Sequence, residues 1–231
     1  MERHSADTVL LFSGLDPSGG AGIAADIETI NQFGVTSLPI ITTLTAQNTQ
    51  KVLSLEPTNN LFLNDQFRLI DDDIYFKTVK IGLLGSLSQI ETISRLLSTR
   101  KDFVIILDPI IMSSSNNELS SNDMIDMMKK VLIPLCTLIT PNIEELKLLA
   151  PGLDEKLAVK SLNCPWTLIT TSDSSEIEIE HRLYHYSDLI RKFSYKKLPG
   201  KYHGSGCTLS SAISALMATG VEVEEASRRG L

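Results

Sequence analysis

The segment with the clearest chemical signal is His203–Thr208 (HGSGCT), which directly precedes the apolar run Leu209–Met217. Apolar residues recur in that run at three- and four-residue spacing, which predicts a helix. The first N–H groups of a helix have no intrahelical partners and carry a partial positive charge. Glycines ahead of them let the backbone wrap closely around an anion. We therefore predict a phosphate-binding turn made by Gly204, Ser205 and Gly206.

Cys207 lies in the same positive field, which favours the thiolate form of a cysteine. On this interpretation a phosphoryl group is transferred at the turn and Cys207 takes up a proton. The alternative is a helix start that buries a small cysteine. The segment by itself leaves both interpretations open.

Polar residues also follow two neighbouring apolar strands. Asp108 follows the predicted strand Phe103–Leu107, and Asn142 and Glu145 follow the predicted strand Thr137–Thr140. Asn142 with Glu145 three residues later is a variant of the helix capping box. Together with Asp108, the same residues could instead hold hydrated Mg²⁺ beside phosphates. We favour the metal site, because these residues and the 203–208 turn are expected on one rim.

The glycine-rich segment Gly14–Gly22 (GLDPSGGAG) connects a predicted strand to a predicted helix. The segment lacks both the dinucleotide-binding G-x-G-x-x-G and the P-loop Gly-Lys-Ser/Thr, and is more typical of a turn that admits a small substrate. Asp26 either reaches that substrate or complements the helix dipole. Gln47 offers a donor and acceptors to a heterocycle, although strand-end loops prefer such residues in any case.

Two further residues stand out from their surroundings. Lys80 lies inside the apolar strand Thr78–Leu83, where a lysine is unusual, and we expect its ammonium group to extend to the rim. We expect His203 to shape the phosphate-binding turn. Cys136 and Cys164 are expected to be core thiols.

Strands alternate with helices along the chain, which predicts βαβ units and a mostly parallel sheet. No linker or fixed repeat interrupts the pattern, so we expect a single domain over residues 1–231. In such sheets the ligand lies beyond the carboxyl ends of the strands.

The predicted strands are Val9–Ser13, Leu38–Thr45, Val52–Leu55 (in a small sheet), Thr78–Leu83, Phe103–Leu107, Thr137–Thr140, Trp166–Thr170 and a polar hairpin within Leu183–Lys196. The predicted helices are Ile23–Phe33, Leu63–Asp72, Leu87–Leu97, Asn122–Val131, Ile143–Leu149 and Leu209–Met217.

The composition narrows the function further. The chain of 231 residues has a net charge of −7, which argues against general nucleic-acid binding. Three cysteines form neither a metal-ligand spacing nor an even disulfide set. Met1–Thr8 is polar, and no apolar stretch is long enough to cross a membrane. We expect a cytoplasmic protein with reduced thiols and no membrane partner.

Taken together, the motifs resemble those of hydroxymethylpyrimidine/phosphomethylpyrimidine kinases, ribokinase-like enzymes of thiamine biosynthesis. The matching blocks occur in the family's order over roughly residues 9–229: GLDPSGGAGIAADI, TLTAQNT, VKIGLLG, LDP, TPNIEEL and HGSGCTLSSAI. The resemblance implies an α/β fold whose mostly parallel sheet is flanked by helices in three layers. We also expect a small lid from residues 45–58. The resemblance further implies ATP, Mg²⁺, a small pyrimidine substrate and usually a homodimer.

The resemblance also implies the reaction and the site residues. ATP phosphorylates the hydroxymethyl group of 4-amino-5-hydroxymethyl-2-methylpyrimidine, and the monophosphate is then phosphorylated again. Cys207 stands where most of the superfamily has a catalytic aspartate. The other implied roles are the anion hole (Gly204, Ser205, Gly206), substrate contacts (Gln47, Asp26, Gly14), contacts with nucleotide phosphates (Asn142, Glu145, Thr170) and magnesium binding (Asp108, Glu145).

Three departures from the family pattern bear on ATP binding. Where the family usually has Val-Lys-Gly-Gly, the chain reads Ile169-Thr170-Thr171-Ser172, without the lysine near the ATP phosphates. The segment between Leu149 and Trp166 is short, so much of a helix is expected to be missing there. The chain also stops at Leu231, before the family's last helical stretch. Two alternatives therefore stay open: a pyridoxal-type kinase, and a pyrimidine-binding protein with weakened catalysis.

Overall fold

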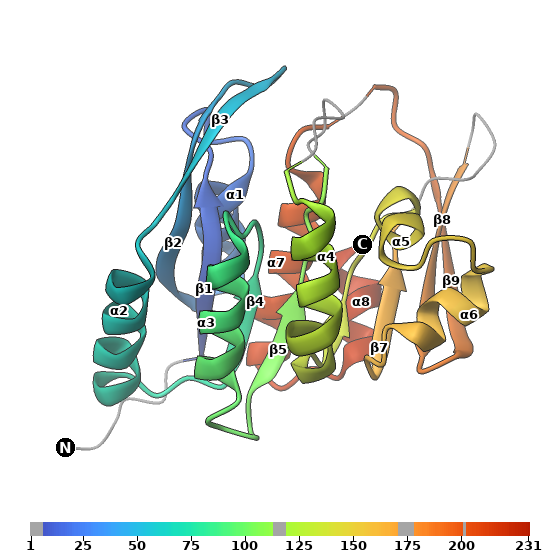
Figure 1. Ribbon diagram of the computed structural model, residues 1–231. Coiled ribbons are helices and arrows are strands. Elements are labelled where there is room, and N and C mark those ends of the chain that lie inside the picture. The colour runs from blue at the N-terminus through green and yellow to red at the C-terminus, as the bar shows by residue number, and fades with distance from the viewer. Residues whose placement is uncertain (1–6, 113–118, 171–177, 201) are drawn as a thin grey trace.

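The computed structural model describes residues 7–112, 119–170, 178–200 and 202–231. Within these residues the strands form one nine-stranded sheet in the order β3-β2-β1-β4-β5-β6-β7-β8-β9 (Figure 1). The strands are β1 (Thr8–Leu15), β2 (Thr36–Gln47), β3 (Val52–Pro57), β4 (Thr78–Ile81), β5 (Val104–Leu107), β6 (Leu138–Ile139), β7 (Trp166–Ile169), β8 (Glu178–His185) and β9 (Asp188–Lys196).

The six strands β2-β1-β4-β5-β6-β7 are parallel, whereas β3, β8 and β9 pair antiparallel at the two ends of the sheet. The parallel strands read as short apolar runs because helices cover both faces. The predicted polar hairpin is confirmed as β8 and β9. The predicted strand at Val52–Leu55 exists as β3, but it forms one edge of the main sheet rather than part of a small separate sheet.

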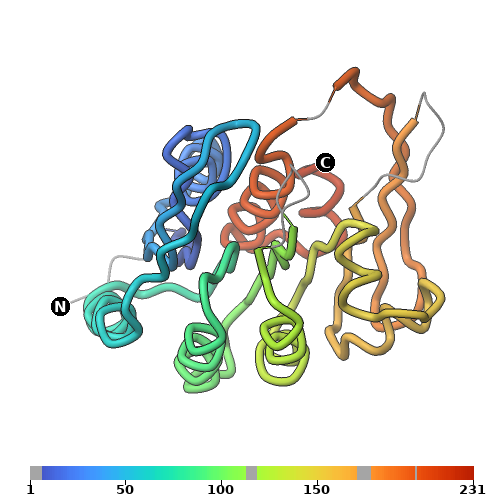
Figure 2. Tube along the Cα trace, turned by 45° about the horizontal axis from the view of Figure 1, so that its top comes forward, coloured from blue at the N-terminus to red at the C-terminus, as the bar shows by residue number. Residues whose placement is uncertain are grey.

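Helices form one layer on each face of this sheet (Figure 2). One layer contains α2 to α6, and the other contains α1, α7 and α8, with α7 packed against both α1 and α8. The helices are α1 (Gly22–Gln32), α2 (Asn60–Asp73), α3 (Leu87–Leu97), α4 (Asn122–Met127), α5 (Ile143–Leu149), α6 (Glu155–Ser161), α7 (Ser205–Ala218) and α8 (Val223–Gly230). Two short helical turns, Met128–Leu132 and Ile133–Leu135, continue α4.

Apolar cores fill both spaces between the sheet and its helices. On the side of α2 to α6, the rings of Phe12 and Phe67 stack with centroids 6.1 Å apart, and Phe76 meets Phe67 edge-on. On the other side, Ile30 of α1 and Ile213 of α7 are fully buried. The sheet is thus held rigidly from both faces, which fixes the ends of its strands relative to one another.

Two helices depart from the sequence expectation. The short segment between Leu149 and Trp166, where much of a helix was expected to be missing, holds a helix of seven residues, α6, which was not among the predicted helices and whose first turn is capped by the Asp154 side chain. Helix α8 follows α7 and had no predicted counterpart, because it spans only eight residues, four of which are charged. None of the helices in the described part of the chain is both long and apolar enough to cross a membrane.

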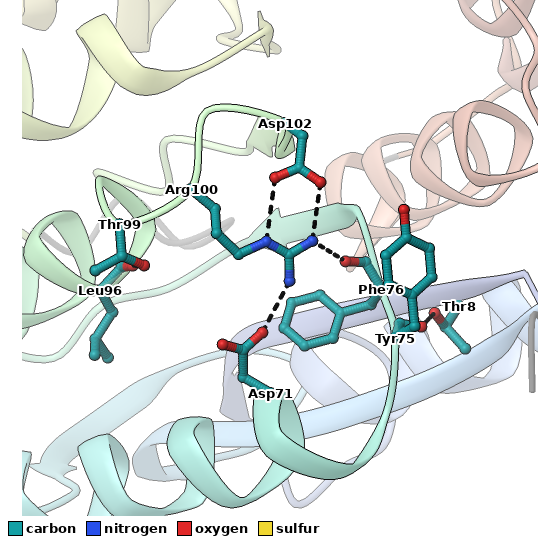
Figure 3. Close-up of polar contacts among 8 residues, drawn as sticks. All are labelled: Thr8, Asp71, Tyr75, Phe76, Leu96, Thr99, Arg100 and Asp102. Atoms are coloured by element: carbon teal, nitrogen blue, oxygen red, sulfur yellow. Dashed lines mark hydrogen bonds and ion pairs between the residues drawn. The ribbon is translucent and has the colours of Figure 1, made fainter. Parts of the chain in front are cut away.

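At the amino ends of the strands, Arg100 joins several segments (Figure 3). Its guanidinium group donates hydrogen bonds to Asp71 at the end of α2, to Asp102, and to the backbone carbonyl of Phe76. It also lies 4.3 Å from the ring centroid of Phe103. The contacts of Arg100 thus link α2 to the segments that precede β4 and β5. These contacts lie at the amino ends of the strands, opposite the carboxyl ends where a ligand is expected.

Candidate active site

A cavity of about 1340 Å³ lies over the carboxyl ends of the parallel strands. Residues that follow six different parallel strands contribute to its lining, as expected for a sheet of this class. The turn before α7 forms another wall, and the tip between β2 and β3 overhangs the cavity through Asn48, Lys51 and Val52, where a small lid was expected. The predicted site residues that line the cavity are Gly14, Gln47, Asp108, Asn142, Glu145, Thr170, Gly204, Ser205, Gly206 and Cys207.

The phosphate-binding turn has the backbone shape that its glycines predict. Gly204 is the N-cap of α7 and adopts a left-handed conformation, with φ of +82°. A Cβ atom at Gly204 would lie 1.9 Å from the carbonyl oxygen of Gly20, so the two glycine-rich loops pack backbone to backbone. At Gly206 a Cβ atom would meet nothing closer than the Asp108 carboxylate at 3.8 Å. The first turn of α7 therefore presents its amides to an open space of the kind that an anion needs.

Replacing Gly204 with alanine is expected to destabilise the protein more than the same change at Gly220. Both glycines have positive φ, +82° and +85°, but a Cβ atom at Gly220 would meet no atom within 4 Å. Gly220→Ala therefore carries about 1 kcal/mol of backbone strain, and Gly204→Ala adds an overpacking cost of about 1–3 kcal/mol. Urea unfolding of both variants measures the difference. Equal losses of stability would contradict the close packing of the two loops.

Cys207 occupies the predicted position, but its protonation differs from the expectation. Burial raises the pKa of the Cys207 thiol to about 12, and the negative charges of Asp108 and Asp26 oppose the lowering effect of Lys80. The predicted preference for the thiolate is therefore wrong for the unliganded protein, because desolvation outweighs the field of the helix. The Cys207 side chain instead hydrogen-bonds to Asp108, and the carboxylate also accepts from Ser210 Oγ at 3.2 Å.

The buried ion pair between Lys80 and Asp26 lies beneath this turn. Lys80 Nζ is 2.7 Å from Asp26 Oδ1, both side chains are fully buried, and Ser211 of α7 donates to the same oxygen at 2.8 Å. The expected extension of Lys80 to the rim is thus wrong. The expected contact between Asp26 and the substrate is not what the structure shows either, since Lys80 and Ser211 engage its carboxylate away from the cavity surface. The pair supports the site from below, where its charges reach Cys207 and Asp108.

Asn142 and Glu145 form a complete capping box at the start of α5. The backbone N–H of Asn142 donates to Glu145 Oε2, and that of Glu145 donates to Asn142 Oδ1, each at 2.9 Å. The capping interpretation is therefore confirmed, and the metal interpretation stays a prediction. Burial raises the pKa of Glu145 to about 8, with a further contribution from the charge of Asp108.

Thr170 lies beside the same cap. Its backbone N–H donates to the carbonyl oxygen of Pro141 at 2.9 Å, and Thr170 bridges to Asn142 in parallel register. The two residues thus form one continuous edge of the cavity after β6 and β7. Thr170 stands where the family usually has the lysine near the ATP phosphates, whereas Thr171 and Ser172, which follow it, lie outside the described residues.

Asp16 is the site residue whose importance the sequence did not reveal. It is 3% exposed, and its carboxylate accepts hydrogen bonds from Ser18 N and Oγ, from Ala21 N and from His203 Nε2, the last at 2.7 Å. It also accepts a hydrogen bond from the Gln47 side chain. The Asp-Pro-Ser-Gly order is a signal for a turn closed by an aspartate side chain. The partners at Gln47 and His203, distant in sequence, could come only from the fold.

Asp16 is expected to make stability depend on pH in acid solution. Burial would raise its pKa, but the hydrogen bonds from Gln47, His203 and Ser18 outweigh burial and lower it from 3.8 to about 2. A carboxyl with a depressed pKa stabilises the folded state above pH 4, and this contribution of ~2 kcal/mol is lost as the pH falls through 2. Urea unfolding between pH 6 and pH 2 should show the stability of Asp16→Asn approaching that of the wild type. A gap that does not change with pH would contradict this.

The comparisons with known proteins agree with this geometry. A family model described as phosphomethylpyrimidine kinase matches residues 16–230. A hydroxymethylpyrimidine/phosphomethylpyrimidine kinase of Aquifex aeolicus is 34% identical over 215 residues, which cover 89% of this chain and 84% of that protein. The chain belongs to the phosphomethylpyrimidine kinase family. The predicted family membership is thereby confirmed, and as a member of the family the protein is a phosphotransferase.

Solved structures of a phosphomethylpyrimidine kinase and of a pyridoxal kinase share the fold of this chain. The phosphomethylpyrimidine kinase of Clostridium difficile gives a TM-score of 0.81 at 30% identity, covering 96% of this chain and 95% of that chain. Pyridoxal kinase of Bacillus subtilis, solved as an ADP complex, gives a TM-score of 0.86 at 27% identity, covering 96% and 88%. The predicted ribokinase-like, three-layer α/β fold is confirmed.

Proposed function

We propose that the protein transfers the γ-phosphoryl group of ATP to the hydroxymethyl group of 4-amino-5-hydroxymethyl-2-methylpyrimidine, and then phosphorylates the monophosphate to the diphosphate. The proposal rests on one observation: the first turn of α7, which forms a wall of the cavity, places Cys207 beside Asp108. Gln47 lines the same cavity from the end of β2. The names of the relatives support the pyrimidine as the substrate.

The geometry fits phosphoryl transfer, which depends chiefly on positioning and on neutralising charge. The amides of Ser205, Gly206 and Cys207 would stabilise negative charge on the transferred group. The Cys207 thiol would give its proton to Asp108, to which it is hydrogen-bonded. The resulting thiolate would accept the proton of the substrate hydroxyl late in the reaction, when that hydroxyl has become acidic. Asn142 and Thr170 form the edge along which the nucleotide phosphates would lie.

Asp108 and Glu145 suit a hydrated magnesium ion. Both carboxyls are buried at the cavity, and burial raises the pKa of each. A cation nearby would favour their ionised forms, and oxygen atoms are the ligands that Mg²⁺ prefers. The described residues contain no cluster of three or more metal-binding side chains, so phosphate oxygens and water would complete the coordination. When bound, Mg²⁺ would neutralise charge on the phosphates.

The test is ADP release from Mg-ATP in the presence of the hydroxymethylpyrimidine, beside pyridoxal and a control without acceptor. We expect ADP to form with the pyrimidine. The kinship with pyridoxal kinases favours pyridoxal as the second candidate, and ADP release with pyridoxal alone would replace the proposal. Saturable pyrimidine binding without ADP release would identify a binding protein that has lost catalysis.

We also propose that the protein is a homodimer in the cytoplasm. Large apolar side chains are exposed on neighbouring elements at one end of the sheet: Leu44 and Leu53 on β2 and β3, and Leu61 and Phe62 on α2. An unpaired surface of this kind is typical of an interface. Light scattering after size-exclusion chromatography would measure the oligomeric state, and a monomer at all concentrations would refute the dimer.

The proposed location in the cytoplasm has a separate basis. All three cysteines are free thiols, which supports a reducing compartment.

A further inference from the structure

The carboxylate of Asp16 connects two walls of the cavity that are far apart in sequence. Asp16 follows β1, Gln47 ends β2, and His203 directly precedes the N-cap of α7. All three residues line the cavity, and both Gln47 and His203 hydrogen-bond to the Asp16 side chain. Asp16 therefore lies where the residue that faces the substrate ring meets the turn that faces phosphate.

The position of this carboxylate is fixed independently of Gln47. Ser18 N donates to Oδ1 at 2.8 Å, while Ser18 Oγ, Ala21 N and His203 Nε2 donate to Oδ2 at 2.9, 3.1 and 2.7 Å. The His203 ring is itself packed, since a Cβ atom at Gly20 would lie 2.9 Å from its Cδ2 atom. With four donors holding the carboxylate, Gln47 has to adapt to Asp16 rather than the reverse.

An ionised carboxylate accepts hydrogen bonds and cannot donate them. The hydrogen bonds that Asp16 accepts lower its pKa to about 2, so the group is ionised at neutral pH. Gln47 must therefore turn its amide nitrogen, Nε2, toward Asp16. The two ends of the amide differ in chemistry, so fixing one end determines what the other end offers to a ligand.

We propose that Asp16 is a positioning residue that holds the Gln47 amide with its oxygen, Oε1, toward the cavity. The site then selects aromatic alcohols that present an N–H donor, such as an exocyclic amino group, and disfavours those that present an oxo or phenolate oxygen at that edge. The inference rests on the proposed function, because it concerns how the pyrimidine is read. Beyond that function, it assigns the selectivity to Asp16, a side chain that need not touch the ring.

The experiment compares the binding of two ligands of nearly equal shape by isothermal titration calorimetry, without nucleotide. The ligands are 4-amino-5-hydroxymethyl-2-methylpyrimidine and its 4-oxo analogue. The wild-type chain should bind the amino compound at least about tenfold more tightly, because a mismatched polar edge leaves a group unpaired. In Asp16→Asn the neutral amide both donates and accepts, so the Gln47 amide can turn and the ratio of the two Kd values should fall toward one.

Two further variants separate positioning from general damage to the site. Gln47→Ala should lose the discrimination as Asp16→Asn does. Ser18→Ala removes one donor to Asp16 but leaves the carboxylate charged, so its ratio should stay near that of the wild type. Thermal unfolding shows whether each variant is folded. A merely structural role of Asp16 would weaken the binding of both ligands equally and leave the ratio unchanged.

A folded Asp16→Asn variant that keeps the wild-type ratio would overturn the inference. A wild-type chain that binds both pyrimidines equally, or binds neither, would overturn it as well. The proposed function is tested separately by ADP release. Discrimination between the ligands without ADP release would leave the inference standing and reject the kinase, whereas ADP release without discrimination would do the reverse.

Discussion

Replacing Cys207 with alanine is expected to lower kcat by about 10²- to 10⁴-fold, the usual range for the loss of a general acid or base. Binding of the pyrimidine should be nearly unchanged, because the thiol is small, buried and hydrogen-bonded to Asp108 rather than placed to read the ring. The loss should therefore fall on kcat and not on KM. Steady-state ADP release, together with calorimetric binding of the pyrimidine, measures both quantities.

Cys207→Ser provides the matched control for this change. The serine hydroxyl can still donate to Asp108, but it is a far weaker acid than a thiol, so turnover should fall between that of the wild type and that of Cys207→Ala. Unchanged turnover in the alanine variant would remove Cys207 from the mechanism. Catalysis would then rest on the amides of the turn and on the charges around Asp108.

Replacing Lys80 with methionine is expected to destabilise the protein by ~3–5 kcal/mol, the cost of removing one partner from a buried ion pair. Methionine fills much of the same volume, so the loss arises from charge rather than from a cavity. The change leaves Asp26 buried without its cation, near the acidic groups of Asp108 and Cys207. Urea unfolding at pH 7 measures the loss.

A double-mutant cycle with Asp26→Asn separates the pair from its surroundings. Removing both charges should recover part of the loss, because no uncompensated charge then remains in this pair. Lys101→Met is the surface control, since Lys101 is exposed in the turn before β5, and it should change stability by less than about 0.5 kcal/mol. A Lys80→Met variant as stable as Lys101→Met would show that the ion pair contributes nothing to folding.

The sequence predicted the order of the strands and of most of the helices between them. Apolar runs such as Val104–Leu107 can be buried on both faces only within a parallel sheet, and their spacing with helices predicts that sheet. The same rule placed Asp108, Asn142 and Thr170 on one rim, since the carboxyl ends of parallel strands meet at one edge. Helix α8 was missed because it is short and half of its residues are charged, so few apolar residues mark it as a helix.

Side-chain roles depended on partners distant in the chain, and these the sequence could not supply. The capping box of Asn142 and Glu145 is local, so the pattern contained it in full. Asp26 and Lys80 each looked like rim residues by position, yet they are 54 residues apart and pair with each other in the core.

The sequence by itself determined the family, the parallel sheet and the glycine turn, because these depend on local spacing and on backbone freedom at a few positions. The tertiary structure decided the chemistry of the side chains. Desolvation made Cys207 a neutral thiol against the field of its own helix, and Asp26 became a support for Lys80 rather than a substrate contact. Asp16, 187 residues from His203, joins two walls of the cavity because folding brings the two glycine loops into contact. Burial and charge act through space, so their effects appear only when the chain is folded.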